Sequence, residues 1–335
     1  MDSQVDRYLK AGTRDNTRRS YQSAIEHFEV TWGGFLPATS DSIARYLAQY
    51  AGVLSINTLK QRLAALAQWH ISQGFPDPTK SPLVKQVIKG IRASHPVQTK
   101  QAKPLPIQHL EHMVQWMRQE IYSTSKPEEA KVLRRDIALL LIGFWRGFRS
   151  DELCRLRIEH IKVNLGQGMQ IYLPYSKGDR HNLGTDYYAP ALKYLCPVSA
   201  YLDWLNCSGL EQGAVFRSIN RWGDIGAEAL HPASLTGILT RIAQKTGLVE
   251  QASYSSHSLR RGFACWANAQ GWDIKALMQY VGWKDLKSAM RYINPEGSFG
   301  NLALNPKGFS GAESHQINEG KTTKIALSNI NTRPS

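Results

Sequence analysis

The stretch from His257 to Tyr292 constrains the chain more than any other part of its 335 residues. His257 and Arg260 are three positions apart, so on a helix their side chains share one face. An apolar helical run follows them, and Gly271 predicts the end of that helix. Residues 274–280 then predict a second, shorter helix, and Tyr292 follows after the end of that helix. A histidine and an arginine on one helix face are thus followed by a tyrosine within a stretch of 36 positions.

A Gly-Trp pair, Gly282 and Trp283, completes the pattern, and Tyr292 stands nine positions after Trp283. With the H-x-x-R helix, this spacing resembles the C-terminal signature of the tyrosine recombinases, the phage integrase family. In that family a Gly-His or Gly-Trp pair follows the H-x-x-R helix, and a nucleophilic tyrosine comes nine residues later. The resemblance implies an enzyme that breaks and rejoins DNA with Tyr292 as its nucleophile. The alternative for Tyr292 is a half-buried core aromatic, as expected for most of the 14 tyrosines.

The segment from Gly147 to Leu153 is similar to the first arginine motif of the same family, G-x-R-x-x-E-L. The resemblance assigns Arg149 as the first catalytic arginine and Glu152 as the acidic residue that orients the site. Arg146 stands where the family commonly has a small Thr or Ser, but the spacing to Glu152 selects Arg149. The alternative is a surface arginine at a helix end that pairs with Asp151 or Glu152.

Arginines suit this chemistry because phosphodiester cleavage places negative charge on the equatorial phosphoryl oxygens. Guanidinium groups are planar, permanently charged and able to donate two hydrogen bonds to such oxygens. Arg149 and Arg260 can therefore clamp a phosphate without a metal ion, and one such donor is worth about 3–4 kcal/mol. Arg261 adjoins Arg260, but the H-x-x-R spacing favours Arg260. A phenol with a pKa of about 10 needs the field of both arginines, or a nearby base, to attack at neutral pH.

Three more residues receive roles from the resemblance. Lys177, on a predicted hairpin turn, corresponds to the family's general-acid lysine and would protonate the leaving 5′-oxygen; Lys-Gly-Asp is also an ordinary turn sequence. His257 is expected to handle a proton or to donate to the phosphate. Trp283 replaces a histidine of many relatives, as in Cre-like members; an indole N–H donates but does not titrate, so we expect it to position and pack. A purely structural Trp283 is the alternative.

Composition favours a polyanionic partner. The net charge is +14, which suits nucleic acid or an anionic membrane surface. No apolar run approaches the roughly 18 residues of a membrane span, and no signal-peptide pattern is present, so a membrane role is disfavoured. The four cysteines form no C-x-x-C pair, and no metal-ligand spacing occurs. We therefore expect a cytosolic protein without metal or other cofactor, and the family resemblance implies the bacterial cytosol or nucleoid.

The fold class predicted is mainly α with a small β-sheet or hairpin. Four segments are predicted: a helical core-binding domain at 1–92, a basic linker at 93–106, a mixed α/β catalytic domain at 107–300, and a C-terminal segment with a flexible tail at 301–335. Residues 1–103 hold 14 lysines and arginines against 7 acidic residues, as a DNA clamp would. The alternative is solvated helix faces. The DNA-binding candidates are Arg14, Arg18, Arg19, Lys60, Arg62, Lys85, Lys89, Arg92, Lys100 and Lys103.

Periodicity and turn residues predict the elements themselves. Helices are predicted at 13–32, 40–50, 55–73, 82–92, 107–120, 131–145, 192–205 and 232–246, in addition to the two after His257. Residues 126–129 are predicted as a polar loop, and strands are predicted at 169–173 and 187–190.

We interpret the chain as a site-specific recombinase that acts through a 3′-phosphotyrosyl intermediate and a Holliday junction, without metal or ATP. Its implied partners are double-stranded DNA with an inverted-repeat core site, three further copies in a tetramer on paired sites, and accessory DNA-bending proteins. A mobile element is the expected setting, with integration, excision and resolution all open. The resemblance also implies that residues near 299–304 dock on a neighbouring protomer. Two alternatives remain: a relaxing enzyme like type IB topoisomerases, and a DNA-binding protein that never cleaves.

Overall fold

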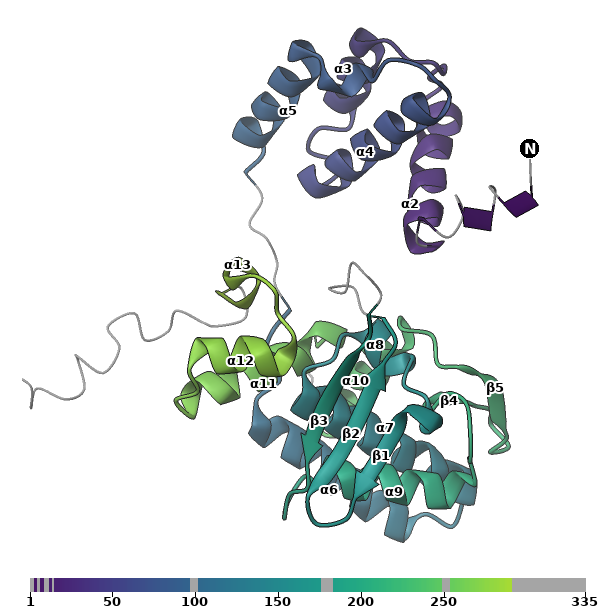
Figure 1. Ribbon diagram of the computed structural model, residues 1–335, viewed down its shortest axis with the longest axis vertical. Helices are drawn as coiled ribbons and strands as arrows, with labels where there is room; N and C mark the ends of the chain where they lie inside the picture. The colour runs from purple at the N-terminus through teal and green to yellow at the C-terminus, as the bar shows by residue number, and fades with distance from the viewer. Residues whose placement is uncertain are drawn as a thin grey trace, which may run out of the picture. The chain divides into compact units, whose positions relative to one another are not determined.

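The computed structural model describes residues 3–4, 7–8, 12–13, 15–96, 102–175, 183–248 and 254–290. The chain divides into two compact units, Met1–Gln101 and Ala102–Ser335. The described parts of both units are mainly helical, and the second also carries two small sheets (Figure 1). The predicted fold class, mainly α with a small sheet, is confirmed.

The first unit is a helical bundle in which α2 packs against α4 and α3 against α5. Phe28, Tyr46 and Leu66 lie at its centre and are completely buried. Ser55 caps α4 as predicted, since its hydroxyl accepts a hydrogen bond from the Thr58 N–H at 3.1 Å. The described helices of this unit are α2 (Asp15–Glu26) with a π-helical turn (His27–Thr31), α3 (Ser40–Gln49), α4 (Ile56–Ser72), a 3-10 turn (Pro78–Lys80) and α5 (Pro82–Ser94).

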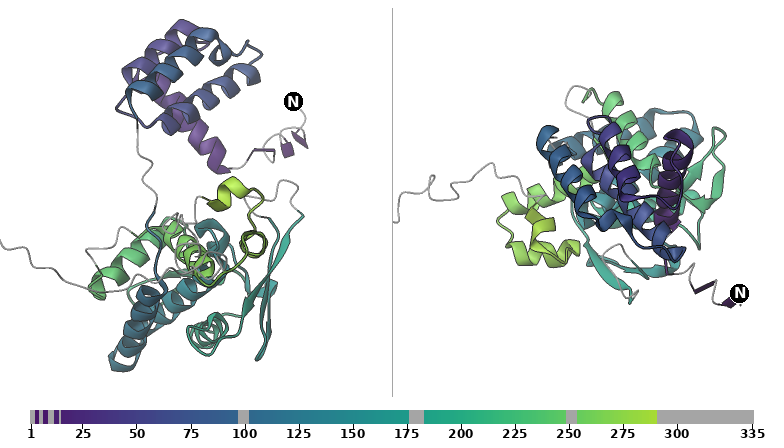
Figure 2. Two further views of the ribbon diagram at one scale, coloured as in Figure 1. Left: turned by 90° about the vertical axis from the view of Figure 1, so that its left-hand side faces the viewer. Right: turned by 90° about the horizontal axis from the view of Figure 1, so that it is seen from above.

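The second unit places a three-stranded antiparallel sheet along one side of its helices (Figures 1 and 2). The strand order is β1-β2-β3, with Met169 of β2 opposite Ala189 of β3. A separate hairpin, β4-β5, stands apart from this sheet. The described strands are β1 (Ile161–Asn164), β2 (Gly168–Leu173), β3 (Thr185–Pro190), β4 (Arg217–Ile219) and β5 (Ile225–Ala229). The described helices are α6 (Ile107–Ser123), α7 (Pro127–Arg146), α8 (Ser150–Cys154), a 3-10 turn (Ile158–His160), α9 (Pro197–Ser208), α10 (Ser234–Lys245), α11 (Ser256–Ala269), α12 (Ile274–Val281) and α13 (Leu286–Met290).

Helix α7 is the central element of this unit, as its apolar sequence predicted. All twelve of its residues from Arg135 to Arg146 are buried. Burying an unpaired charge is very costly, and the charged residues among them have partners within the fold. Asp136, fully buried, accepts from Arg135 at 2.7 and 3.0 Å and from Arg241 at 2.5 Å.

Several predicted boundaries were wrong. Residues 127–129 belong to α7 and do not form a loop, because Pro127 starts the helix and two glutamates favour its positive N-terminal end. Helix α9 begins at Pro197, not at 192, because Leu195 adopts a positive φ of 49°. The first strand, β1, was missed because its four residues alternate without a strong apolar signal, and the short β4-β5 hairpin was missed for the same reason.

Both ends of the stretch predicted as an extended linker, 93–106, belong to the folded units on either side. Residues 93 and 94 still belong to α5, and Leu105 is completely buried. Within the described residues, no helix has the length and apolar content needed to cross a membrane.

Candidate active site

The site is built from the C-terminal end of α7. Helix α7 ends at Gly147, whose φ of +57° lies in the left-handed region that glycine adopts without a Cβ penalty. A Cβ at this position would also lie 3.3 Å from Val281. The turn directs the Gly147 carbonyl toward α11, where it accepts a hydrogen bond from Arg260 Nη1 at 2.5 Å.

Glu152 holds Arg149 in place at the start of α8. Its carboxylate accepts from the Arg149 backbone N–H at 2.9 Å and from Arg149 Nη1 at 2.6 Å. The Glu152 side chain is only 3% exposed, whereas that of Arg149 is 26% exposed. A buried carboxylate therefore orients a guanidinium that still reaches solvent. Asp151, the other acidic neighbour, pairs with Arg155 at 2.6 Å instead.

Arg260 approaches the same carboxylate from α11. Its Nη1 lies 4.0 Å from Glu152 Oε2, and its side chain is 1% exposed. Trp283 lies beside it, with the Arg260 Cζ 5.1 Å from the indole centroid, within cation–π range. Arg149 and Arg260, 111 positions apart in sequence, thus converge on Glu152, and the pair carries one positive charge more than this carboxylate neutralises.

His257 and Trp283 take different positions around this pair. His257 is exposed in the first turn of α11, and its backbone N–H donates to the capping hydroxyl of Ser255 at 3.3 Å. Trp283 is 5% exposed and stands two residues after α12 ends at Val281. Its burial and its contact with Arg260 suit a side chain that packs and positions.

Arg146, the competing arginine of the motif, has a different environment. Its guanidinium donates to the carbonyls of Tyr188 at 3.1 Å and Tyr280 at 2.5 Å. Its Cζ also lies 3.9 Å from the Tyr280 ring centroid. Burial lowers the pKa of Arg146 from its ordinary value. The two carbonyls belong to β3 and α12, so Arg146 ties α7 to both neighbouring elements and serves the fold.

The thiol next to the motif is a poor competitor for the role of nucleophile. Burial raises the pKa of Cys154, in α8, to about 12. It is therefore protonated at neutral pH, and a thiol is a far weaker nucleophile than a thiolate.

Four predicted site residues, Lys177, Tyr292, Arg14 and Lys100, lie outside the described residues. By position, Lys177 falls between β2 and β3, and Tyr292 falls two residues after α13 ends at Met290. The structure thus brings together Arg149, Glu152, Arg260 and Trp283, and it places His257 three residues before Arg260 on α11.

Sequence reasoning missed two features of this site. It identified the glycine of the motif but not the use of the Gly147 carbonyl as an acceptor for Arg260. It also missed the contact between Trp283 and Arg260. Neither has a local signal, because each depends on how α7, α11 and α12 pack together.

The basic side chains of the first unit differ in their availability. Arg62 is half-buried and donates to the Tyr46 hydroxyl at 2.8 Å, with His27 Nδ1 2.5 Å from the same nitrogen. Desolvation and the charge of Arg62 lower the pKa of His27. Arg18 forms an ion pair with Asp15. The other described candidates are exposed, namely Arg19, Lys60, Lys85, Lys89, Arg92 and, in the second unit, Lys103.

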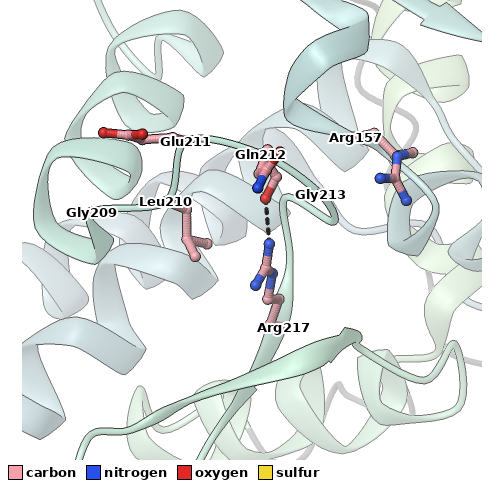
Figure 3. Close-up of a pocket in the computed structure, with 7 residues that line it drawn as sticks. All are labelled: Arg157, Gly209, Leu210, Glu211, Gln212, Gly213 and Arg217. Carbon is pink, nitrogen blue, oxygen red and sulfur yellow. Dashed lines mark hydrogen bonds between the residues drawn. The ribbon is translucent and has the colours of Figure 1, made fainter.

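A pocket of about 490 Å³ lies elsewhere in the second unit, at the turn between α9 and β4 (Figure 3). Two of its lining residues are arginines, but both are already engaged. Arg157 pairs with Glu159 at 2.6 Å, and Arg217 donates to the carbonyls of Ala214 and Gln212. None of the predicted site residues lines this pocket. Among the described residues, no group of His, Cys, Asp and Glu could hold a metal ion.

Comparison with known proteins shows which family and fold this chain resembles. The model of the phage integrase family matches residues 115–297. The chain is 29% identical over 316 residues to an integrase/recombinase xerD homolog of Selenomonas ruminantium, across 91% of this chain and 89% of the relative. It is 24% identical over 273 residues to recombinase cre of Escherichia phage P1, across 77% of each chain. The fold is similar to that of the XerH site-specific recombinase bound to a palindromic difH substrate, with a TM-score of 0.55, 20% identity, and coverage of 80% of this chain and 71% of that one.

Proposed function

Because the chain belongs to the phage integrase family and is a tyrosine site-specific recombinase, we propose that Tyr292 attacks a DNA phosphate held between Arg149 and Arg260. One observation carries the proposal: both guanidinium groups converge on the buried carboxylate of Glu152. Their charge is fixed in place before substrate arrives, so little reorganisation is needed when charge develops on the phosphate.

The proposed reaction exchanges one phosphodiester for another. The Tyr292 oxygen forms a bond to phosphorus while the bond from phosphorus to the 5′-oxygen breaks, giving a 3′-phosphotyrosyl link and a free 5′-hydroxyl. Lys177 supplies the proton to the departing 5′-oxygen, and His257 handles the phenol proton or donates to the phosphate. Attack by the 5′-hydroxyl of a partner strand reverses these steps. The link conserves the bond energy, so rejoining requires no ATP.

The arginines perform the charge stabilisation that a divalent cation performs in many phosphoryl-transfer enzymes. We therefore expect cleavage to proceed in EDTA. Trp283 packs against Arg260 and keeps its guanidinium directed at the site. Glu152 does the same for Arg149.

The proposed substrate is duplex DNA with an inverted-repeat core site. The palindromic substrate of the XerH complex supports this choice, and so does the charge of +7 carried by residues 1–103. In this proposal the segment 1–92 is the core-binding domain, 93–106 the linker and 107–300 the catalytic domain, followed by a C-terminal segment. Four copies would act on two sites through a Holliday junction in a mobile element, assisted by DNA-bending proteins, in the bacterial cytoplasm where such DNA resides.

The test uses duplexes built from inverted repeats near the gene and nicked close to each candidate cleavage position. A nick lets the short strand beyond the cleaved phosphate diffuse away, so the covalent adduct accumulates. We expect a protein–DNA adduct on a denaturing gel, in EDTA, with the wild-type chain. Tyr292→Phe should abolish the adduct and leave DNA binding unchanged.

The matched control is Tyr280→Phe, which removes a hydroxyl from a tyrosine of the aromatic core beside Phe263. It should still form the adduct. Specific binding without any adduct on any nicked duplex would favour a protein that binds DNA and does not cleave it. Relaxation of plasmids that lack the repeats would favour the topoisomerase-like alternative.

A further inference from the structure

The second unit begins with a short segment, residues 102–106, that docks on α11. Leu105 is completely buried although both neighbouring residues in the sequence are prolines. Its backbone N–H donates to the carbonyl of Ser258 at 3.0 Å. Helix α11 is the helix that carries His257 and Arg260.

Gly262 makes this docking sterically feasible. A Cβ at position 262 would lie 2.1 Å from the Leu105 carbonyl oxygen. Real Cβ atoms do not come this close to another heavy atom. Glycine is otherwise unfavourable in the middle of a helix. The residue therefore serves the close approach of the 102–106 backbone, and any larger side chain must displace that backbone or the helix.

The two contact points bracket Arg260 on α11. Ser258 and Gly262 are four residues apart, so they lie on one face of the helix. Arg260 is two residues from each, roughly 200° around the helix, and points to the opposite side. That side faces Gly147 and Glu152. The docked segment thus supports the back of the helix whose front holds the arginine.

A second contact fixes the same end of α11. His109, in the first turn of α6, lies with its Nδ1 2.6 Å from the hydroxyl of Tyr254. Tyr254 is 3% exposed and stands two residues before α11 begins. Residues 105–109 therefore contact α11 in two ways. Leu105 binds the backbone of the helix at Ser258, and His109 contacts Tyr254, just before the helix begins.

We propose that residues 105–109 form a strap that positions Arg260 and His257 for cleavage, with Leu105, Gly262 and Tyr254 as positioning residues. The inference rests on the proposed function. It extends that function, because these residues do not touch the phosphate and act only through the placement of α11. The displacement expected from a methyl group at Gly262 is of the order of 1 Å, and misplacement on that scale can cost about 100-fold in rate.

The test compares Gly262→Ala with Gly237→Ala in the full-length chain. Gly237 also lies inside a helix, α10, but a Cβ there would meet nothing within 4 Å. We expect Gly262→Ala to form the covalent adduct at least tenfold more slowly at saturating protein, with a Kd for the nicked duplex within threefold of wild type. Gly237→Ala should match wild type in both. A purely structural role would reduce the folded fraction or raise the Kd, and it would leave the rate per bound complex unchanged. That result would overturn the inference.

A milder pair covers the case in which Gly262→Ala fails to fold. Tyr254→Phe removes only the hydroxyl that contacts His109, and Tyr201→Phe removes the hydroxyl of another buried tyrosine, in α9. We expect a severalfold slower rate per bound complex for Tyr254→Phe and a wild-type rate for Tyr201→Phe. Equal rates for both would overturn the inference.

A double-mutant cycle identifies the residue through which the strap acts. If Gly262 acts through Arg260, then Gly262→Ala should slow cleavage less than threefold in an Arg260→Lys background. The guanidinium whose position depends on Gly262 is already absent from that background. Full additivity would contradict the assignment to Arg260. Absence of any adduct with the wild-type chain would instead count against the proposed function, so the two failures are distinguishable.

Discussion

Replacing Glu152 with glutamine tests whether one buried carboxylate organises both arginines. The substitution keeps the shape of the side chain but removes its charge, and it exchanges one acceptor oxygen for an NH₂ group. One of the two hydrogen bonds from Arg149, at 2.6 and 2.9 Å, then loses its acceptor. A hydrogen bond to a charged group contributes about 1.5–3 kcal/mol. The nearby Arg260, 4.0 Å away and buried, also loses its closest counter-charge.

We therefore expect Glu152→Gln to lower the free energy of unfolding of the second unit by about 2–3 kcal/mol. This value lies at or below the roughly 3–5 kcal/mol expected for a broken, fully buried pair, because Arg149 is 26% exposed. With a urea m-value of about 2 kcal/mol/M, the midpoint should fall by about 1–1.5 M. The cleavage rate at saturating protein should fall about 10-fold to 100-fold, since both guanidinium groups lose their orientation.

Asp151→Asn is the matched control, because Asp151 is the adjacent carboxylate and pairs with Arg155 at a partly exposed position. It should cost less than about 1 kcal/mol and leave cleavage unchanged. Equal urea midpoints and equal cleavage rates for the two variants would refute the reasoning.

Three further variants test other parts of the account. Gly147→Ala should destabilise the second unit by about 1–2 kcal/mol in thermal unfolding, because alanine disfavours the left-handed backbone. It should also slow cleavage, because the Gly147 carbonyl accepts the hydrogen bond that holds Arg260. An unchanged cleavage rate would contradict this second expectation. Hydrogen bonds from its own backbone N–H, from Arg157 and from the Gly213 N–H lower the pKa of Glu159 to about 2, so Glu159→Gln should cost roughly 0.5–1 kcal/mol at pH 7. That cost should shrink as the pH falls from about 4.5 toward 2, and a cost independent of pH would exclude the carboxylate as its source. Arg62→Ala should lower the melting temperature of the first unit as well as its DNA affinity, because Arg62 donates to Tyr46 inside the bundle; weaker binding at an unchanged melting temperature would show that Arg62 serves only DNA.

The features that could be predicted from sequence are those with a local physical signal. The apolar run of α7, the Ser55 cap and the two helices after His257 each follow from periodicity or from a capping residue. Glu152 three residues after Arg149 is likewise a local arrangement, since it forms the hydrogen bonds that cap α8.

The features that could not be predicted depend on contacts between distant segments. Arg62 and the exposed Lys60 are both basic residues of α4, and nothing in the local sequence separates them. The Arg62 side chain nevertheless contacts Tyr46 and His27 inside the bundle. Leu105 lies in a sequence that is typical of an extended linker, and only the missing Cβ of Gly262, 157 positions later, lets it dock. Periodicity is read over short windows of sequence, and no such window contains both Leu105 and Gly262.

The most direct test of the central claim locates the covalent link on the chain. The adduct formed on a nicked duplex would be digested with nuclease and trypsin and analysed by mass spectrometry. Cleavage after Arg291 and Lys307 releases a peptide, residues 292–307, whose single tyrosine is Tyr292. We predict that the nucleotide mass is found on this peptide. A nucleotide on any other peptide would contradict the assignment of Tyr292 as the nucleophile.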